Sequence, residues 1–216
     1  MIVFDWDGTL SDSVAQIVVA VQQAATGMGL KAPSDAAAAN IIGLGLREAM
    51  ARLYPDIPDT DLVAMIQAYS RTYVANEQDV PALFPGALET LHELRARGYG
   101  LGVATGKSRR GLDRVLGKLG LEGFFDVTRC ADETRSKPHP LMLEQIMAEQ
   151  SVAAERVVMV GDTEYDLEMA SNAGVASIGV SFGVHSVERL RKHKPIAVVD
   201  ALPELLEALP EDSSWR

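Results

Sequence analysis

Short apolar runs alternate along this chain with longer stretches in which apolar residues recur every three to four positions. The short runs stop at polar or turn-forming residues, a pattern typical of strands that are buried on both faces of a sheet. They cover residues 1–4, 101–104, 124–130, 157–160 and 176–180. Strands that alternate with helices are joined by βαβ crossovers, so the pattern predicts an α/β fold built on a parallel sheet.

Three of the longer stretches place their apolar residues on one helical face and end at a glycine, which is the usual residue beyond a helix C-terminus. They are Leu88, Leu91 and Leu94 before Gly98; Leu112, Val115, Leu116 and Leu119 before Gly120; and Leu167, Ala170 and Ala173 before Gly174. We expect a helix over each of these segments.

Residues 14–82 interrupt the alternation, because they carry helical patterns but no convincing strand. Ser13 is the expected N-cap of the first helix, and further helices are expected over 46–53 and from 61 to about 76. The first helical face consists of Val14, Ile17, Val18, Val21, Ala25 and Met28. The sequence therefore predicts a core of residues 1–13 and 83–216 with an inserted all-helical domain, residues 14–82.

Composition and charge exclude several classes of protein. Of the 216 residues, 47% are hydrophobic, which is ordinary for a globular chain. Thirty acidic and twenty basic residues give a net charge of −10, which argues against nucleic acid as the main partner. One cysteine, Cys130, fits a reducing compartment, and no apolar stretch is long enough to span a bilayer. We expect a cytoplasmic protein, either a monomer or a homodimer, that binds no membrane.

Polar clusters follow four of the expected strands, directly or after a short loop. In a parallel sheet the carboxyl ends of the strands share one edge, where open α/β folds bind their ligands. The clusters are Asp5-Trp6-Asp7-Gly8-Thr9, Thr105-Gly106-Lys107-Ser108, Ser136-Lys137-Pro138 and Gly161-Asp162-Thr163-Glu164-Tyr165-Asp166. We expect them to converge on one site.

The first cluster has two interpretations. Asp5 and Asp7 are two positions apart, so in extended backbone both carboxylates point to the same side, whereas Trp6 points away. The segment is also compatible with a hairpin turn at Asp7-Gly8. The helical spacing after Ser13 disfavours the hairpin, because a second strand would alternate with a period of two.

Asp162 and Asp166 would bring two more carboxylates to the same edge. At an effective dielectric constant near 20, each close pair of carboxylates repels by roughly 4 kcal/mol. Mg²⁺ would remove this repulsion, since it binds one or two carboxylates together with phosphate and water. The two residues are also compatible with an N-cap and a first-turn acid of the following helix. Lys137 could offset the remaining negative charge, or could be a solvated loop lysine.

Two glycine-containing motifs carry weaker signals. The backbone N–H groups at Thr105-Gly106 suit a phosphate, but the following Lys107-Ser108 is not part of a P-loop, because Leu101 stands where that loop needs glycine. Gly179-Val180-Ser181-Phe182-Gly183 matches a nucleophile elbow. Only 33 residues follow it, too few for the strands that would carry the other groups of a triad, so we interpret the segment as a loop.

In this order, the four clusters resemble the motifs of the haloacid dehalogenase superfamily of phosphotransferases. Asp5-Trp6-Asp7-Gly8-Thr9 resembles its first motif, Thr105 its second, Lys137 its third, and Gly161-Asp162-x-x-x-Asp166 its fourth. The insert resembles the small α-helical cap of the phosphoglycolate phosphatase-like branch. The resemblance implies a Rossmann-like parallel sheet core with helices on both faces, together with an α-helical cap domain.

The resemblance also implies a Mg²⁺-dependent phosphatase that hydrolyses a small phosphorylated metabolite, similar to phosphoglycolate, through an aspartyl-phosphate. Asp5 would be the nucleophile, and Asp7 the general acid and base. Mg²⁺ would be held by the side chains of Asp5 and Asp162 and the backbone carbonyl of Asp7, with Asp166 either at the metal or orienting Lys137. Phosphate would be bound by Thr105, by Lys137 and by N–H groups around Trp6, Asp7 and Gly106. In the cap, the implied substrate-facing residues are Gly43, Leu44, Gly45 and Arg47.

Other activities share parts of this pattern. β-Phosphoglucomutases have the Asp-x-Asp pair but need a histidine early in the first cap helix, and the first histidine here is His92. Phosphonate-cleaving relatives need a lysine in that helix, and the first lysine here is Lys31, beyond the helix end. A non-catalytic phosphate-binding protein would be expected to lack Asp5 or Asp162, and both are present. We therefore expect water to be the phosphoryl acceptor.

Overall fold

The computed structural model describes residues 1–76 and 82–209. Its centre is a six-stranded sheet in which all neighbouring strands are parallel, in the order β3-β2-β1-β4-β5-β6. The strands are β1 (Ile2–Phe4), β2 (Leu101–Thr105), β3 (Val127–Cys130), β4 (Val158–Gly161), β5 (Ala176–Val180) and β6 (Ala197–Val199). The prediction of an α/β fold on a parallel sheet is confirmed.

Two strands differ from the expectation. β3 begins at Val127 and not at residue 124, because residues 121–124 form a turn in which Phe124 N donates to Leu121 O and Gly123 has a φ of +69°. β6 is only three residues long and carries no periodicity of its own, so its pairing with β5 is what makes it a strand.

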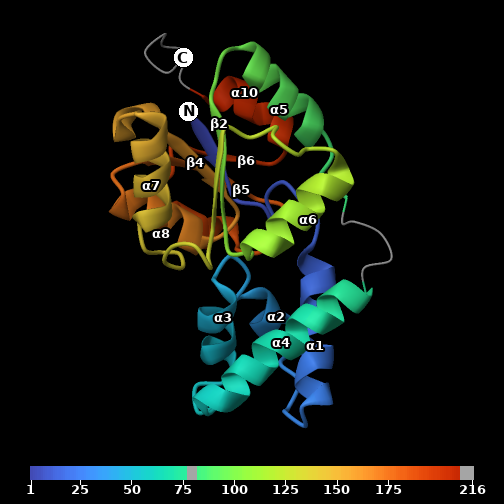
Figure 1. Ribbon diagram of the computed structural model, residues 1–216. Coiled ribbons are helices and arrows are strands. Elements are labelled where there is room, and N and C mark those ends of the chain that lie inside the picture. Colours follow the sequence, from blue (N-terminus) through green and yellow to red (C-terminus); the bar gives the residue numbers. More distant parts are fainter. Residues whose placement is uncertain (77–81, 210–216) are drawn as a thin grey trace.

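The sheet separates two apolar cores, because successive residues of a strand face opposite sides. Ile2 and Phe4 contribute to one core, and Met1 and Val3 to the other. The first core is covered by α5 (Ala87–Ala96), α6 (Arg109–Leu119) and α10 (Leu205–Ala208), the second by α7 (Leu141–Gln150) and α8 (Glu164–Asn172) (Figure 1). Three short elements complete this part: α9 (Val187–Arg191), η1 (Ala154–Arg156) and η2 (Leu202–Glu204).

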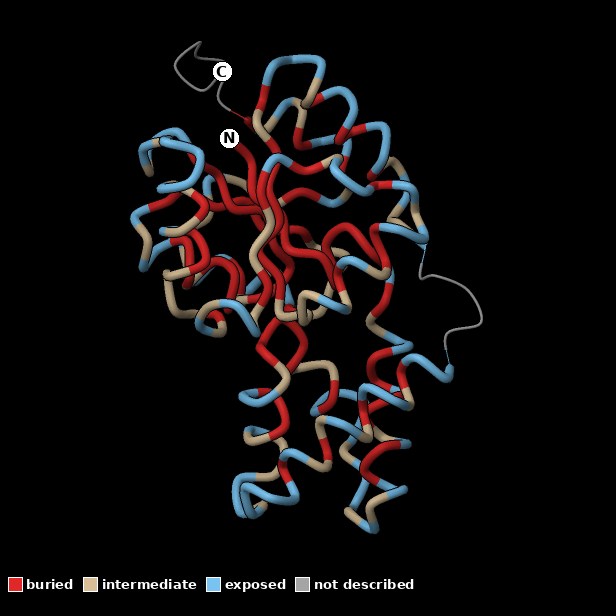
Figure 2. The backbone as a smooth tube through the Cα atoms, viewed as in Figure 1, coloured by how far each residue is buried: buried red, intermediate tan, exposed pale blue. Residues whose placement is uncertain are grey.

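Four helices form a separate group beyond the carboxyl edge of the sheet (Figure 1). They are α1 (Val14–Gly27), α2 (Asp35–Ala39), α3 (Leu46–Leu53) and α4 (Asp59–Asn76). α1 packs on α4 around residues such as Val21, Met65 and Tyr69, which gives the group its own buried interior (Figure 2). The chain enters and leaves the group through adjacent segments, since Asp12 N donates to Ala82 O at 2.9 Å. None of the described helices is long and apolar enough to cross a bilayer.

Candidate active site

The ends of β1, β2 and β4 meet at the sheet edge that faces helices α1–α4. Phe4 pairs with Val103 on β2 and with Val160 on β4, so these three residues form one row across the sheet. Asp5 follows that row by one residue, and Thr105 and Asp162 follow it by two. All three side chains are buried. Because the described pairs of β1 are parallel and α1 follows it, the hairpin interpretation of Asp7-Gly8 is wrong.

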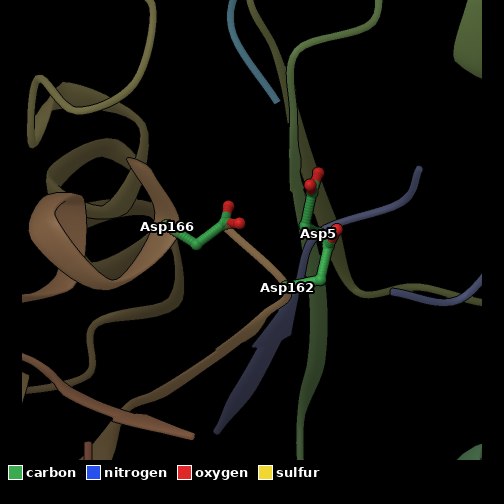
Figure 3. Close-up of side chains that lie close together, drawn as sticks. All are labelled: Asp5, Asp162 and Asp166. Carbon is green, nitrogen blue, oxygen red and sulfur yellow. The ribbon is translucent and has the colours of Figure 1, made fainter. Parts of the chain in front are cut away.

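Three carboxylates form a buried cluster at this edge. Asp5, Asp162 and Asp166 each offer an oxygen within 4.8 Å of the others. Figure 3 shows Asp5 and Asp162 side by side, with Asp166 directed toward them from α8. Burial, followed by repulsion from Asp166, raises the pKa of Asp162 to about 7. Burial also raises the pKa of Asp5 well above its usual value, although Lys137 opposes that shift.

Lys137 lies inside this cluster and is 1% exposed. Its Nζ is 2.8 Å from Asp5 Oδ1 and 2.6 Å from Asp166 Oδ1. Burial alone would lower the pKa of Lys137, but the two carboxylates more than offset this and raise it. The solvated-loop interpretation of Lys137 is therefore wrong. One ammonium among three carboxylates leaves an excess of negative charge, which suits a divalent cation.

The hydrogen bonds of the cluster differ from one carboxylate to the next. Asp162 accepts from Thr9 Oγ1 at 2.8 Å and from Val184 N at 2.9 Å. Asp5 Oδ2, in contrast, has no hydrogen-bond partner among the described residues. A buried carboxylate oxygen without a partner is costly, so Asp5 is the oxygen donor here that is open to a metal ion or a phosphoryl group.

The start of α8 separates the roles of Asp162 and Asp166. Thr163 is the N-cap, and it exchanges hydrogen bonds with Asp166 in a capping box, so the interpretation of Asp162 as the N-cap is wrong. Asp166 Oδ2 accepts from both the backbone N and the hydroxyl of Thr163, and its Oδ1 faces Lys137. Asp166 Oδ1 lies 2.6 Å from Lys137 Nζ, so Asp166 is placed to orient that ammonium.

Asp7 lies outside the acidic cluster and has its own partners. Its Oδ1 accepts from Ser13 Oγ at 2.6 Å and lies 3.0 Å from Lys107 Nζ. The prediction that Ser13 is the N-cap of α1 is confirmed, but its hydroxyl makes no capping hydrogen bond and donates to Asp7 instead. Trp6 lies in the core, edge-to-face with Phe125 at 6.3 Å.

Lys107 is a site residue that the sequence motifs did not identify, because Lys107-Ser108 follows Gly106 as in a P-loop but lacks the earlier glycine of that loop. It follows Thr105 by two positions, and Thr105 Oγ1 accepts from Lys107 N at 3.2 Å. Its side chain is 11% exposed. The sequence feature that could have identified Lys107 is its spacing of two residues from Thr105, the same spacing as between Asp5 and Asp7.

Gly8 and Gly183 let the backbone approach Asp162 closely. A Cβ on Gly8, which has a φ of +83°, would lie 2.4 Å from Asp162 Oδ2, and one on Gly183 would lie 2.2 Å from Asp162 Cβ. Ser181 donates to Asp200 Oδ1. Residues 181–183 therefore form a loop in which Gly183 packs on Asp162, as the interpretation of this segment as a loop predicted. The nucleophile-elbow pattern of residues 179–183 did not indicate this contact.

The loop that joins α2 to α3 rests directly on the core. A Cβ on Gly106 would lie 2.4 Å from Leu44 O, and Gly45 N donates to Ser136 Oγ at 2.8 Å. Gly43 faces Thr163, where a Cβ would lie 3.1 Å from the hydroxyl oxygen. Residues 43–45 thus contact the loops that carry the second, third and fourth clusters.

A cavity of about 540 Å³ lies between this loop, α1, α4 and the start of α6. Asp7, Gly106 and Lys107 line it from the core, and Gly43 and Leu44 from the loop. We call it the substrate cavity. Gly45 is outside its lining, and so is Arg47, whose side chain is 54% exposed and pairs with Asp59 at 2.7 Å. The structure therefore brings Asp7, Gly106 and Lys107 together with Gly43 and Leu44, but it places Arg47 at the surface. The side chains of Asp5, Thr105, Lys137 and Asp162 are buried beside the cavity and are not part of its lining.

Comparison with known proteins gives consistent results. Residues 2–180 match the sequence profile of a family described as haloacid dehalogenase-like hydrolase. The chain is 34% identical to "probable phosphatase IndB" of Dickeya dadantii (strain 3937), over 96% of this chain and 92% of that protein. It is 32% identical to the phosphoglycolate phosphatase of Vibrio parahaemolyticus serotype O3:K6 (strain RIMD 2210633), over 97% of this chain and 95% of that protein. A solved hydrolase from Pseudomonas syringae shares the fold, with a TM-score of 0.87, 21% identity and 95% coverage of both chains.

Proposed function

Because the chain belongs to the haloacid dehalogenase-like hydrolase family, we propose that it is a Mg²⁺-dependent phosphatase of a small phosphorylated metabolite. The observation that carries the proposal is the pairing of buried Asp5, with its unpartnered oxygen, and Lys137 at the sheet edge next to a cavity. The names of the relatives support a phosphate monoester as the substrate. Phosphoglycolate and similar small phosphate monoesters are therefore the first substrates to test.

In the proposed reaction Asp5 attacks phosphorus and the bond to the leaving oxygen breaks, which gives an aspartyl-phosphate. Asp7, at the wall of the substrate cavity, donates a proton to that leaving oxygen. Asp7 then takes a proton from water, whose oxygen attacks the aspartyl-phosphate and releases inorganic phosphate while Asp5 is restored. Lys137 and the backbone near Thr105 and Gly106 hold the negative charge of the phosphoryl oxygens.

The acidic cluster fits Mg²⁺ for two reasons. The negative charge of three buried carboxylates is larger than the positive charge of the one ammonium beside them, and Asp5 Oδ2 has no hydrogen-bond partner among the described residues. We propose that Asp5, Asp162 and the backbone carbonyl of Asp7 hold the ion. When bound, it would neutralise the charge of the carboxylates and of the substrate phosphate. Asp166 would keep Lys137 directed at Asp5.

Residues 14–82 are proposed to act as a cap domain on a core of residues 1–13 and 83–216. The contacts of residues 43–45 with three core loops support this, because they close one side of the site over Gly106. Water is the proposed acceptor. α1 contains neither histidine nor lysine, so this helix does not supply the group that a mutase or a phosphonate-cleaving enzyme would need there.

The direct test is phosphate release from a panel of phosphorylated metabolites, including phosphoglycolate, with and without Mg²⁺. Asp5→Asn keeps the volume of the side chain but removes the nucleophile, so we expect turnover to fall by at least a thousandfold. Asp12→Asn is the matched control, because Asp12 is exposed and in the same segment. Turnover of Asp5→Asn within tenfold of wild type, or full activity in excess EDTA, would refute the proposal.

A further inference from the structure

Among the described residues, Tyr165 is the one core residue in an apolar cluster that otherwise belongs to the helical insert. It lies in the first turn of α8 and is nevertheless only 3% exposed. The insert residues packed around it are Ile41, Leu44, Ala49 and Leu53. Burial of an aromatic ring removes a large apolar area from water, so Tyr165 holds the insert to the core at this point.

Hydrogen bonds to one residue of the insert, Asn40, add to this apolar contact. Tyr165 Oη donates to Asn40 O at 2.7 Å. Arg189 Nη1 donates to Asn40 Oδ1, also at 2.7 Å, and the same guanidinium pairs with Glu164. Asn40 ends α2 as its C-cap residue. The end of this insert helix is therefore bound, through both its backbone and a side chain, by residues of α8 and α9 in the core.

The segment that follows Asn40 is the loop that rests on the core beside the substrate cavity. Residues 41–45 are buried throughout, although they lie at the junction of the insert and the core (Figure 2). Gly43 lines the cavity, and a Cβ added to it would lie 3.5 Å from Tyr165 Cδ2, so the ring packs against the backbone of the loop. The contacts of Tyr165 thus fix both the start and the middle of this loop.

The acidic cluster does not depend on these contacts, although Asp166 is the next residue in α8. Asp166 Oδ2 accepts from the backbone N and the hydroxyl of Thr163, and its Oδ1 faces Lys137. None of these contacts involves the side chain of Tyr165. A change confined to the Tyr165 hydroxyl should therefore act on the loop and leave the cluster as it is.

We propose that Tyr165 is a positioning residue that holds residues 43–45 against the core and beside the substrate cavity, through its ring and through its hydrogen bond to Asn40. The side chain does not line the cavity, so it acts on the substrate through this loop. The assignment rests on the phosphatase function proposed above and adds to it a residue that determines substrate affinity.

Amide hydrogen exchange of the substrate-free protein, measured by NMR, tests the assignment without turnover. The reporter is the N–H of Gly45, which donates to Ser136 Oγ across the junction. Tyr165→Phe keeps the ring and removes the hydroxyl, so opening of the loop no longer breaks the bond to Asn40. We expect Gly45 to exchange about three- to tenfold faster in this variant. The amides of β4 should not change, which shows that the core remains folded.

Tyr54→Phe is the matched control. Tyr54 Oη donates to Lys31 O at 2.9 Å, which is the same kind of hydrogen bond but joins two residues of the insert. This variant should leave the exchange of Gly45 unchanged. Unaltered exchange of Gly45 in Tyr165→Phe, or an equal acceleration in both variants, would overturn the positioning role.

Steady-state kinetics with phosphoglycolate and 4-nitrophenyl phosphate separate this assignment from the phosphatase function. In Tyr165→Phe we expect KM for phosphoglycolate to rise at least threefold while kcat stays within twofold of wild type, because the acidic cluster is intact. An unchanged KM, or a fall in kcat as large as the rise in KM, would place Tyr165 outside the proposed role. If neither probe nor any metabolite of the panel releases phosphate, the phosphatase function fails, while the exchange of Gly45 still decides whether Tyr165 holds the loop.

Discussion

Replacing Asp162 with asparagine should stabilise the metal-free protein, although it removes a proposed metal ligand. The carboxylate is fully buried, and burial together with repulsion from Asp166 raises its pKa from 3.8 to about 7. An asparagine can keep both hydrogen bonds, since its carbonyl can accept from Val184 N and its amide can donate to Thr9 Oγ1. The variant therefore loses the buried charge but not its partners.

The size and the pH dependence of the stability gain follow from the raised pKa of Asp162. Between pH 3.8 and about 7 the folded chain binds a proton at Asp162 that the unfolded chain has released, so stability falls as pH rises through this window. A shift of about three units corresponds to about 4 kcal/mol once the pH exceeds 7. Relaxation and coupling to Asp166 reduce this, so we expect Asp162→Asn to gain about 2–4 kcal/mol at pH 8, or on the order of 5–10 °C in Tm.

The assay is chemical and thermal unfolding of both proteins in EDTA at pH 8 and at pH 5, repeated with Mg²⁺. At pH 5 the advantage of the variant should shrink to about 1–1.5 kcal/mol, because only the part of the pKa difference between pH 3.8 and pH 5 then opposes folding of the wild type. Mg²⁺ at pH 8 should stabilise the wild type and leave the variant nearly unchanged. Asp56→Asn, at an exposed aspartate, makes the same change in net charge and should have no such effect. A variant less stable than wild type at pH 8 in EDTA, or a gain that does not vary with pH, would refute this reasoning.

Three further predictions concern the ion pair between Asp5 and Lys137, the contact between Gly106 and the loop of residues 43–45, and the identity of the phosphoryl acceptor. Lys137→Met should destabilise the protein by about 3–5 kcal/mol at pH 8, as measured by urea unfolding, because it leaves buried carboxylates unpaired; a loss below 1 kcal/mol would contradict the ion pairs. Gly106→Ala should raise KM at least tenfold, because its Cβ would lie 2.4 Å from Leu44 O and prevent the loop of residues 43–45 from contacting the core. In the control Gly117→Ala, on α6, the added Cβ meets only a flexible glutamate and should leave KM unchanged, so an equal response of both variants would count against the loop contact. With β-glucose 1-phosphate, inorganic phosphate should appear faster than glucose 6-phosphate, and the reverse order would identify a mutase.

Local spacing was sufficient to predict most of the fold. A strand of four or five apolar residues that ends at a polar turn can be recognised alone, because burial on both faces requires an unbroken run. Helices such as α6 were equally visible, since one apolar face and a final glycine determine where the helix packs and ends. β6 was not visible, because its three residues depend on β5 for their hydrogen bonds. The start of β3 was placed three residues too early, because residues 121–124 form a turn that the apolar run does not reveal.

The sequence by itself also determined which residue types gather at the carboxyl edge, because parallel strands place their ends there whatever the details of packing. Only the tertiary structure decided how the charges pair. Lys107 and Asp7 are 100 positions apart in the chain, and their ion pair depends on how α6 starts after β2. Arg47, which looked suited to the substrate, lies at the surface with Asp59. Periodicity shows which face of an element is buried, but a contact between side chains depends on where two elements meet, and that is set by the packing of the whole chain.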